Sequence, residues 1–158
     1  MIKLRKVSEK DCRLIWKWAN DPEVRAESFT PKAIPYNDHV IWFERKNNDP
    51  DSYLYIAENT DRKSVGQVRF ELEGNDAIIS ISLDRKFRGK GYGSIIIALA
   101  SQKIFEISEV NVIHAYIKKG NIASKSAFQK AGFIFLENAV INDQQAGHFI
   151  LKKKEELI

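Results

Sequence analysis

Apolar and polar residues alternate along several short stretches of the chain, a pattern typical of strands in a half-buried sheet. The alternation and the strand-forming composition predict strands over residues 2–5, 53–58, 64–73, 76–83, 112–117, 133–139 and 148–154. Polar turns separate the strands over 53–58, 64–73 and 76–83, so we expect these three to form an antiparallel meander. The last two strands should pair as a hairpin around Asn142-Asp143-Gln144-Gln145.

Apolar residues at helical spacing predict helices between these strands. They cover residues 9–20, 22–26, 39–47, a stretch from the glycines at 89–93 to about residue 107, and 121–131. Ser8 is the expected cap of the first helix and Asn37 or Asp38 that of the third. Residues 28–37 contain two prolines and are predicted to form a loop.

The order of these elements defines the fold class. The strand over 76–83, the helix after it and the strand over 112–117 require a right-handed parallel crossover. The remaining strands read as antiparallel arms on either side. We therefore predict an α/β (α+β) fold, with a central mixed and mostly antiparallel sheet, flanking helices and a single domain over residues 1–158.

Charge and composition narrow the class of protein. The net charge of +4 and a pI near 9.1 favour an anionic ligand, and the scattered lysines do not call for nucleic acid. No apolar run approaches the ~18 residues of a membrane span, and the N-terminus is not of signal-peptide type. The one cysteine, Cys12, fits a reducing cytoplasm. We expect a cytoplasmic protein with no metal, membrane or nucleic-acid partner.

The glycine-rich stretch Arg88-Gly89-Lys90-Gly91-Tyr92-Gly93-Ser94 carries the clearest chemical signal. Glycines let the backbone turn sharply, and the start of the following helix offers unpaired N–H groups and the positive end of the helix dipole. These features predict a phosphate site. The spacing fits neither a Walker loop nor a dinucleotide fingerprint, because the glycines and the Lys-Ser/Thr pair are not where those motifs need them.

The pattern Arg-x-x-Gly-x-Gly, from Arg88 to Gly93, resembles the GNAT superfamily of acyl-coenzyme A N-acyltransferases. A second stretch, from Asn121 to Gly132-Phe133, is similar to that family's Asn-x-x-Ala/Ser segment ending in Gly-Phe. The resemblance covers the whole order of elements. It implies acetyl-coenzyme A as the cofactor, bound by Ile81, Ser82, Leu83, Arg88, Gly89, Lys90, Gly91, Tyr92, Gly93, Ser94, Asn121, Lys125 and Phe128.

The resemblance also implies direct acyl transfer to an amine, and here the chain departs from the family. Many members carry a glutamate on the strand before the loop, whereas residues 78–81 hold no acid. Glu71 and His39 are the catalytic candidates, and His114 and Tyr116 are alternatives. Phe128 occupies the position at which the family often has a tyrosine that protonates the departing thiolate. A site without a strong base suits an amine of pKa near 8, roughly 10% neutral at pH 7.

The N-terminal third is expected to select the acceptor. Residues 18–43 resemble N-acetyltransferases of pseudaminic and other nonulosonic acid biosynthesis, which implies the 4-amino group of a nucleotide-linked, for example UDP-linked, aminodideoxy sugar. The candidate substrate residues are Arg25, Ser28, Phe29, His39 and Arg69. The alternatives are a ribosomal-protein-type N-terminal acetyltransferase and a catalytically silent acyl-coenzyme A sensor. A homodimer is a further hypothesis.

Overall fold

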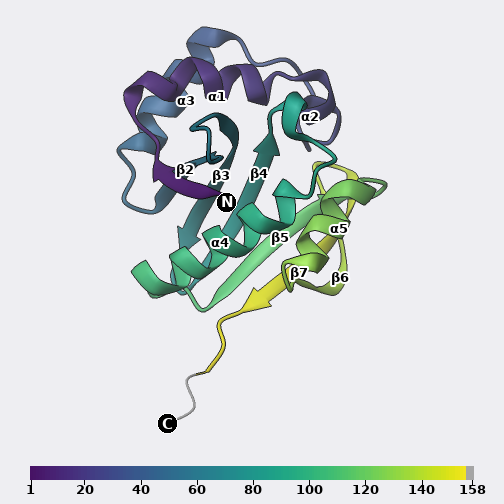
Figure 1. Ribbon diagram of the computed structural model, residues 1–158. Coiled ribbons are helices and arrows are strands. Elements are labelled where there is room, and N and C mark those ends of the chain that lie inside the picture. The colour runs from purple at the N-terminus through teal and green to yellow at the C-terminus, as the bar shows by residue number, and fades with distance from the viewer. Residues whose placement is uncertain (156–158) are drawn as a thin grey trace.

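A seven-stranded sheet forms the centre of the molecule, with the strands in the order β1-β2-β3-β4-β5-β7-β6 (Figure 1). A computed structural model describes residues 1–155, and the last three residues of the predicted domain lie outside it. The strands are β1 (Lys3–Lys6), β2 (Ser52–Glu58), β3 (Ser64–Glu73), β4 (Asp76–Leu83), β5 (Val112–Lys118), β6 (Ile134–Ile141) and β7 (Gln144–Lys152). Every neighbouring pair is antiparallel except β4 and β5, which are parallel, so the predicted fold class is confirmed.

The parallel pair is short. β4 and β5 pair only where Asp76, Ala77 and Ile78 face Val112, Ile113 and His114. Beyond these residues the two strands separate, and Figure 1 shows them diverging from a common lower end. Residues 79–83 of β4 therefore keep β3 as a partner on one side and have no strand partner on the other.

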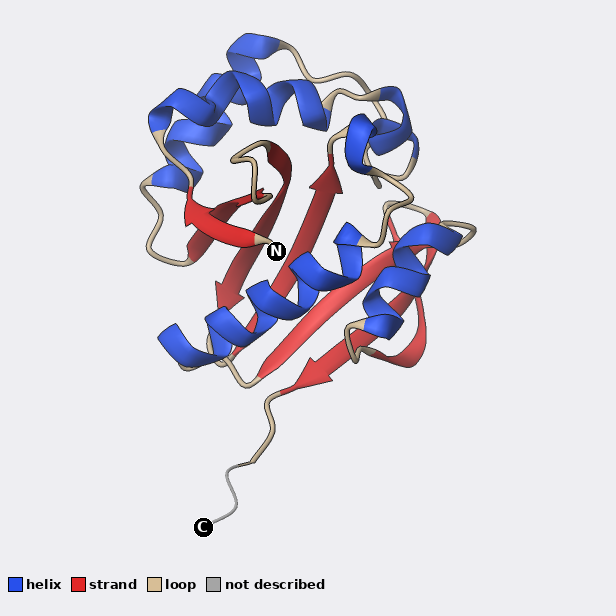
Figure 2. Ribbon diagram, viewed as in Figure 1, coloured by secondary structure: helices blue, strands red, loops and turns tan. Residues whose placement is uncertain are grey.

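Helices cover both faces of the sheet (Figure 2). α4 (Tyr92–Ile107) and α5 (Ile122–Lys130) pack on one face, while α1 (Cys12–Ala19) and α3 (Tyr36–Asn47) pack over β2 on the other. The short α2 (Pro22–Ala26) follows α1, and single 3-10 turns, η1 (Glu9–Asp11) and η2 (Arg85–Phe87), precede α1 and α4.

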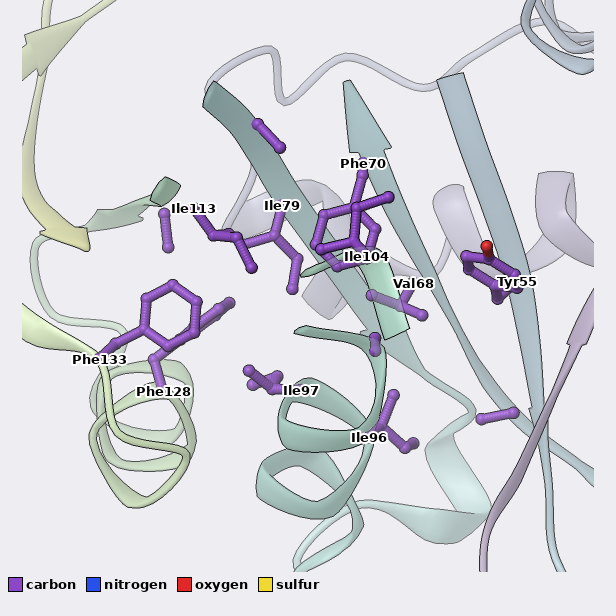
Figure 3. Close-up of a cluster of buried hydrophobic side chains, with 14 of the residues drawn as sticks. Tyr55, Val68, Phe70, Ile79, Ile96, Ile97, Ile104, Ile113, Phe128 and Phe133 are labelled. Carbon is purple, nitrogen blue, oxygen red and sulfur yellow. The ribbon is translucent and has the colours of Figure 1, made fainter. Parts of the chain in front are cut away.

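Two hydrophobic clusters hold these layers together. The larger one lies between the sheet and α4 and α5, and includes Phe70, Ile104 and Phe128 (Figure 3). The smaller one joins α1 and α3 to the opposite face of β2. Because side chains alternate along a strand, β2 sends Tyr55 to the larger cluster and Ile56 to the smaller one. Burying an isoleucine or phenylalanine in this way is worth about 1.5–3 kcal/mol.

Some predicted element boundaries are wrong. The helix predicted from residue 9 begins as a 3-10 turn, because the Asp11 carboxylate accepts two hydrogen bonds from Arg5 of β1 and one from the Ser8 N–H, each of 2.8 Å. α3 begins at Tyr36 rather than His39, so Asn37 and Asp38 lie inside the helix and do not cap it.

The final hairpin is also tighter than predicted. Asn142 and Asp143 alone make the turn, with φ of +47° and +63°. Both residue types tolerate this left-handed backbone, which suits a two-residue hairpin turn. β7 consequently starts at Gln144, four residues before the predicted strand.

His39, predicted to act in catalysis and substrate binding, lies inside the smaller cluster. It is only 2% exposed, its Nε2 is 3.0 Å from the Cys12 carbonyl oxygen, and its ring lies against Trp42 and Phe43. Burial lowers the pKa of His39, and the carbonyl contact opposes that shift only in part. The structure therefore gives His39 a role in packing α3 onto α1.

This burial leads to a prediction about stability and pH. A histidine whose pKa is lowered by folding binds protons more readily in the unfolded chain, so stability is complete above about pH 6.5 and declines as the pH falls below it. We expect the free energy of unfolding to fall between about pH 7 and pH 5. In His39→Gln that slope should be shallower, as measured by urea denaturation at several pH values. An unchanged slope would place the titrating group elsewhere.

A second prediction concerns α4. Ile104 is 0% exposed and Ile107, one turn later, is 49% exposed. Ile104→Ala should lower the free energy of unfolding by about 2–5 kcal/mol, because it leaves a cavity in the larger cluster. Ile107→Ala makes the same chemical change and should cost less than about 1 kcal/mol. Equal losses in chemical denaturation would contradict this account of the core.

Candidate active site

A cavity of about 790 Å³ lies where β4 and β5 separate. Its walls come from β3, β4, β5, the start of α4, α5 and the segment around α2. It brings together most of the predicted cofactor residues: Ile81, Ser82, Leu83, Arg88, Gly89, Gly91, Tyr92, Gly93, Ser94, Asn121 and Phe128. Lys90 and Lys125 do not line it.

The glycine-rich loop forms one end of this cavity. Gly89 and Gly91 have φ of +74° and +84°, a left-handed backbone that favours glycine, and α4 begins directly afterwards at Tyr92. The first N–H groups of α4 have no partner within the helix and point toward the loop end of the cavity. Consecutive N–H groups at the positive end of a 16-residue helix form a site for a phosphate group.

Two predicted residues on α5 shape the wall beside this loop. Asn121 caps α5, because its Oδ1 accepts a hydrogen bond of 3.2 Å from the Ser124 N–H. Phe128 is 3% exposed and packs edge-to-face on Phe133. A phenyl ring cannot donate a proton, so this position supplies shape and not acid catalysis.

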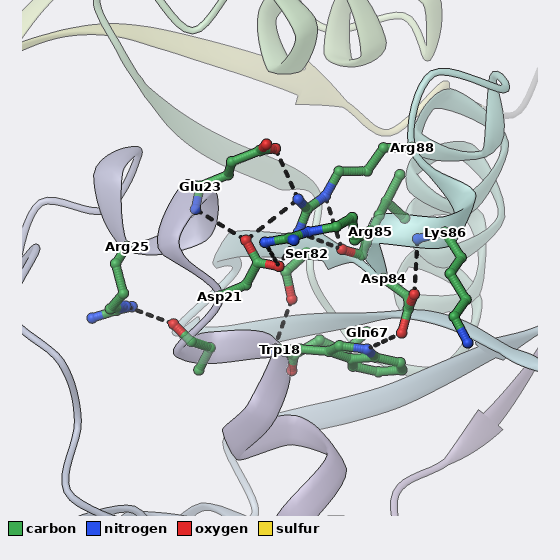
Figure 4. A network of polar contacts seen from close by, with 12 residues as sticks. Trp18, Asp21, Glu23, Arg25, Gln67, Ser82, Asp84, Arg85, Lys86 and Arg88 are labelled. Atoms are coloured by element: carbon green, nitrogen blue, oxygen red, sulfur yellow. Dashed lines mark hydrogen bonds and ion pairs between the residues drawn. The ribbon is translucent and has the colours of Figure 1, made fainter.

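Arg88 lines the cavity, yet its guanidinium is directed elsewhere (Figure 4). Nε and Nη2 donate to the Leu83 carbonyl oxygen at 3.2 and 3.0 Å. Nη1 donates to Glu23 at 2.8 Å and to Asp21 at 3.4 Å, and Nη2 also lies 3.4 Å from Asp21. The loop therefore presents mainly backbone groups to the cavity.

Another part of the cavity wall is the segment over residues 23–30, which includes the predicted substrate residues Arg25, Ser28 and Phe29. Arg25 stabilises this segment, because its guanidinium donates to the carbonyl oxygens of Ala19 and Thr30 at 2.6 and 2.8 Å. Burial lowers the pKa of Arg25. The arginine thus both lines the cavity and holds its wall.

Distant parts of the chain also hold this segment. Lys118 of β5 donates to the Ala26 carbonyl at 2.9 Å, and Gln144 of β7 donates to the Phe29 carbonyl at 2.8 Å. Trp16 and Asn20 both donate to the Ile34 carbonyl at 2.8 Å. Sequence reasoning missed Lys118 and Gln144, since the residues they contact lie 92 and 115 positions away and no local pattern marks them.

Arg69 of β3 is the predicted substrate residue with the most unusual surroundings. Its guanidinium lies 4.9 Å from the centre of the Trp42 ring, and its Nε is 3.3 Å from Glu71 without a hydrogen bond. Burial lowers the pKa of Arg69, and the Glu71 charge opposes that shift. Nη1 and Nη2 make no hydrogen bond within residues 1–155, and Arg69 lines the cavity.

Glu71, the other predicted catalytic residue, is not brought to the cavity. Its Oε2 accepts a hydrogen bond of 2.6 Å from Ser52 and lies 3.1 Å from the Lys46 ammonium. These contacts hold the carboxylate over β2 and β3. Neither Glu71 nor His39 is therefore placed to act as the base.

Of the alternatives, Tyr116 lines the cavity and His114 does not. Tyr116 stacks on His148 with 4.5 Å between ring centres, and His148 Nε2 is 2.8 Å from His114 Nδ1. His114 Nε2 in turn lies 3.2 Å from Asp76. This column of rings fixes the position of Tyr116 against β7.

Comparison with known proteins agrees with this geometry. The chain is 24% identical over 136 residues to the acetyltransferase PseH of Campylobacter jejuni, covering 84% of this chain and 85% of PseH. It is 25% identical over 133 residues to the uncharacterized protein MJ1062 of Methanocaldococcus jannaschii, covering 82% of this chain but only 27% of that longer protein.

A solved structure has the same fold. The spermidine N-acetyltransferase of Vibrio cholerae, in complex with CoA and spermine, superimposes with a TM-score of 0.86 at 19% identity, covering 96% of this chain and 95% of that one. Within residues 1–155, no helix is both long and apolar enough to cross a membrane.

The family itself follows from a match to most of the chain. Residues 2–134 match the model of the acetyltransferase (GNAT) domain. The predicted acetyl-coenzyme A-dependent N-acetyltransferase is confirmed at this level, since acetyl transfer defines the family. With the glycine loop, the separated strands and the family match in agreement, the chain belongs to the GNAT acetyltransferases.

Proposed function

We propose that the protein transfers an acetyl group from acetyl-coenzyme A to the 4-amino group of a nucleotide-linked aminodideoxy sugar. The observation that carries this proposal is Arg69, which lines the cavity and whose terminal N–H groups make no hydrogen bond to residues 1–155. The Arg69 guanidinium has lost part of its hydration on folding. A negatively charged group of the acceptor would therefore bind it favourably. The diphosphate of a nucleotide sugar brings that charge, and the resemblance to PseH points the same way.

Different parts of the cavity wall bind the cofactor and the acceptor. The backbone N–H groups of the glycine loop and of the start of α4 bind the cofactor diphosphate. The unpaired edge of β4, over residues 79–83, offers main-chain groups to the amide-containing arm of the cofactor. When bound, acetyl-coenzyme A supplies an activated thioester. The acceptor binds beside residues 23–30 and Arg69.

Tyr116 is the residue we assign to the reacting amine. Of the sequence candidates, it lies on the cavity wall, and its ring is held by the stack on His148. A phenol hydroxyl can both donate and accept a hydrogen bond, so Tyr116 serves to orient the amine. An amine of pKa near 8 reacts at such a site because roughly a tenth of it is already neutral.

One observation favours a second kind of acceptor. Glu27 lines the same cavity and its side chain is exposed, so a carboxylate is available to a cationic amine. The Vibrio cholerae relative of the same fold acts on spermidine. A polyamine is therefore the second candidate.

The cofactor site leads to a prediction at Gly91. Replacing Gly91 by alanine adds a Cβ at φ +84°, where the new methyl group and the strained backbone disturb the phosphate site. We expect acetyl-coenzyme A binding, measured by calorimetry, to weaken by roughly tenfold or more. Binding should also weaken with added salt.

Gly74 provides a matched control. It has φ +61° in the turn between β3 and β4, again with nothing within 4 Å of an added Cβ. Gly74→Ala should cause comparable strain and leave acetyl-coenzyme A binding unchanged. If both variants bind as the wild type does, the glycine loop is not the phosphate site.

The acceptor is tested by competition. Acetyl-coenzyme A is offered with a UDP-linked 4-amino-4,6-dideoxyhexose, spermidine and a panel of N-terminal peptides, and the acetylated products are identified by mass spectrometry. We expect the sugar to be acetylated first. Acetylation of spermidine or a peptide with the sugar untouched would replace the proposal by that alternative, and no product with any amine would favour a silent sensor.

Arg69 supplies the corresponding variant. Arg69→Gln should raise the KM for the UDP-linked sugar by roughly tenfold, because one charge-assisted contact to the diphosphate is lost. Arg62→Gln removes the same charge from the exposed turn before β3 and should leave this KM unchanged. Equal KM values for the two variants would show that Arg69 does not bind the acceptor.

A further inference from the structure

The corner between α1 and α2 is fastened to the cofactor loop by charged side chains (Figure 4). Asp21 and Glu23 stand at the start of α2, and Arg88 stands in the loop, more than 60 residues later. α2 overlaps the segment over residues 23–30 that lines the cavity. The contact therefore joins the cofactor loop to this part of the cavity wall.

The Arg88 guanidinium makes four hydrogen bonds within the protein. An arginine side chain has five N–H groups. Nε–H and one N–H of Nη2 point to the Leu83 carbonyl, and the second N–H of Nη2 faces Asp21. The two N–H groups of Nη1 are used by Glu23 and Asp21. A phosphate at Arg88 would therefore compete with these partners for the guanidinium.

The charges around Arg88 are balanced in the same way. Arg85 also lies 3.5 Å from Asp21, so two arginines face two carboxylates. Burial would raise the pKa of Asp21, but hydrogen bonds from Arg88 and from the Glu23 N–H lower it overall, which keeps the carboxylate ionised. The loop arginines consequently contribute little net positive charge to the phosphate site.

Two neighbouring contacts strengthen the same junction. Trp18 of α1 donates from its ring nitrogen to Asp84 at 2.9 Å, and the Asp84 N–H donates to the Val65 carbonyl at 2.8 Å. Asp21 also accepts a hydrogen bond from the Glu23 N–H at 3.0 Å, which caps α2. The corner is thus attached both to the end of β4 and to the loop that follows it.

We propose that Arg88 is a positioning residue that holds the acceptor segment against the cofactor loop, and that it is not a ligand of the cofactor phosphates. The four hydrogen bonds and the ion-pair contact of Arg88, the balanced charges, and the overlap of α2 with residues 23–30 carry this assignment. If Arg88 has this role, the rigidity of residues 22–30 depends on a residue of the cofactor loop. Only the choice of acceptor in the last assay rests on the function proposed above.

The experiment compares Arg88→Gln, Arg88→Lys and Arg85→Gln. Arg85→Gln is the matched control. It removes the same charge from a nearby position, where the arginine side chain is 66% exposed. The first readout is hydrogen exchange of the amides of residues 22–30, followed by mass spectrometry. The second is acetyl-coenzyme A binding by calorimetry. Neither readout needs an acceptor, so both decide the question even if the wild type does not acetylate the UDP-linked sugar.

We expect exchange over residues 22–30 to be faster in Arg88→Gln by about threefold or more, and unchanged in Arg85→Gln. Arg88→Lys keeps the charge but has fewer donors, so it should fall between wild type and Arg88→Gln. Acetyl-coenzyme A should bind each variant within about threefold of the wild type. With a productive acceptor, Arg88→Gln should raise the acceptor KM more than the KM for acetyl-coenzyme A.

Either of two results overturns the proposal. One is wild-type exchange over residues 22–30 in Arg88→Gln. The other is acetyl-coenzyme A binding that weakens by more than about tenfold in Arg88→Gln but not in Arg85→Gln, which would make Arg88 a phosphate ligand. A thermal unfolding curve for each variant confirms that the compared proteins are folded.

Discussion

The separation of β4 from β5 is the constraint on which the rest of the site depends. A parallel pair in the middle of a sheet would normally continue to the ends of both strands, because each unpaired backbone group loses a hydrogen bond. Here pairing stops after Ile78 and His114, and the gap beyond them becomes the cavity. The two hydrophobic clusters supply the stability that lets the sheet remain open at this point.

The two ends of the cavity recognise their ligands by different means. At the loop end, main-chain N–H groups and a helix dipole are fixed in place by left-handed glycines, so recognition there costs little rearrangement. Beside residues 23–30, side chains such as Arg25 and Arg69 contribute to the cavity wall.

Sequence patterns predicted the order and type of the elements, although several boundaries are wrong, and they predicted most of the glycine-loop residues that line the cavity. The glycines of the loop and the Asn121 cap act locally, within a few residues, and local patterns record such interactions well. The acceptor end was only partly predictable. Arg25, Ser28, Phe29 and Arg69 do line the cavity, whereas His39 looked available in a polar context and is buried by the packing of α3 on α1. The direction of the Arg88 guanidinium also depended on α2, which is distant in sequence.

Several of the hydrogen bonds that hold residues 23–34 end on main-chain carbonyl oxygens. Their donors come from Lys118, Gln144, Arg25, Trp16 and Asn20, and their acceptors lie between residues 26 and 34. A carbonyl is present whatever residue occupies the position. Substitutions at carbonyl-anchored positions such as Ala26, Phe29 and Ile34 can therefore change the surface of the cavity wall or its surroundings while these hydrogen bonds are kept, so this wall can be remodelled by single changes without rebuilding the scaffold.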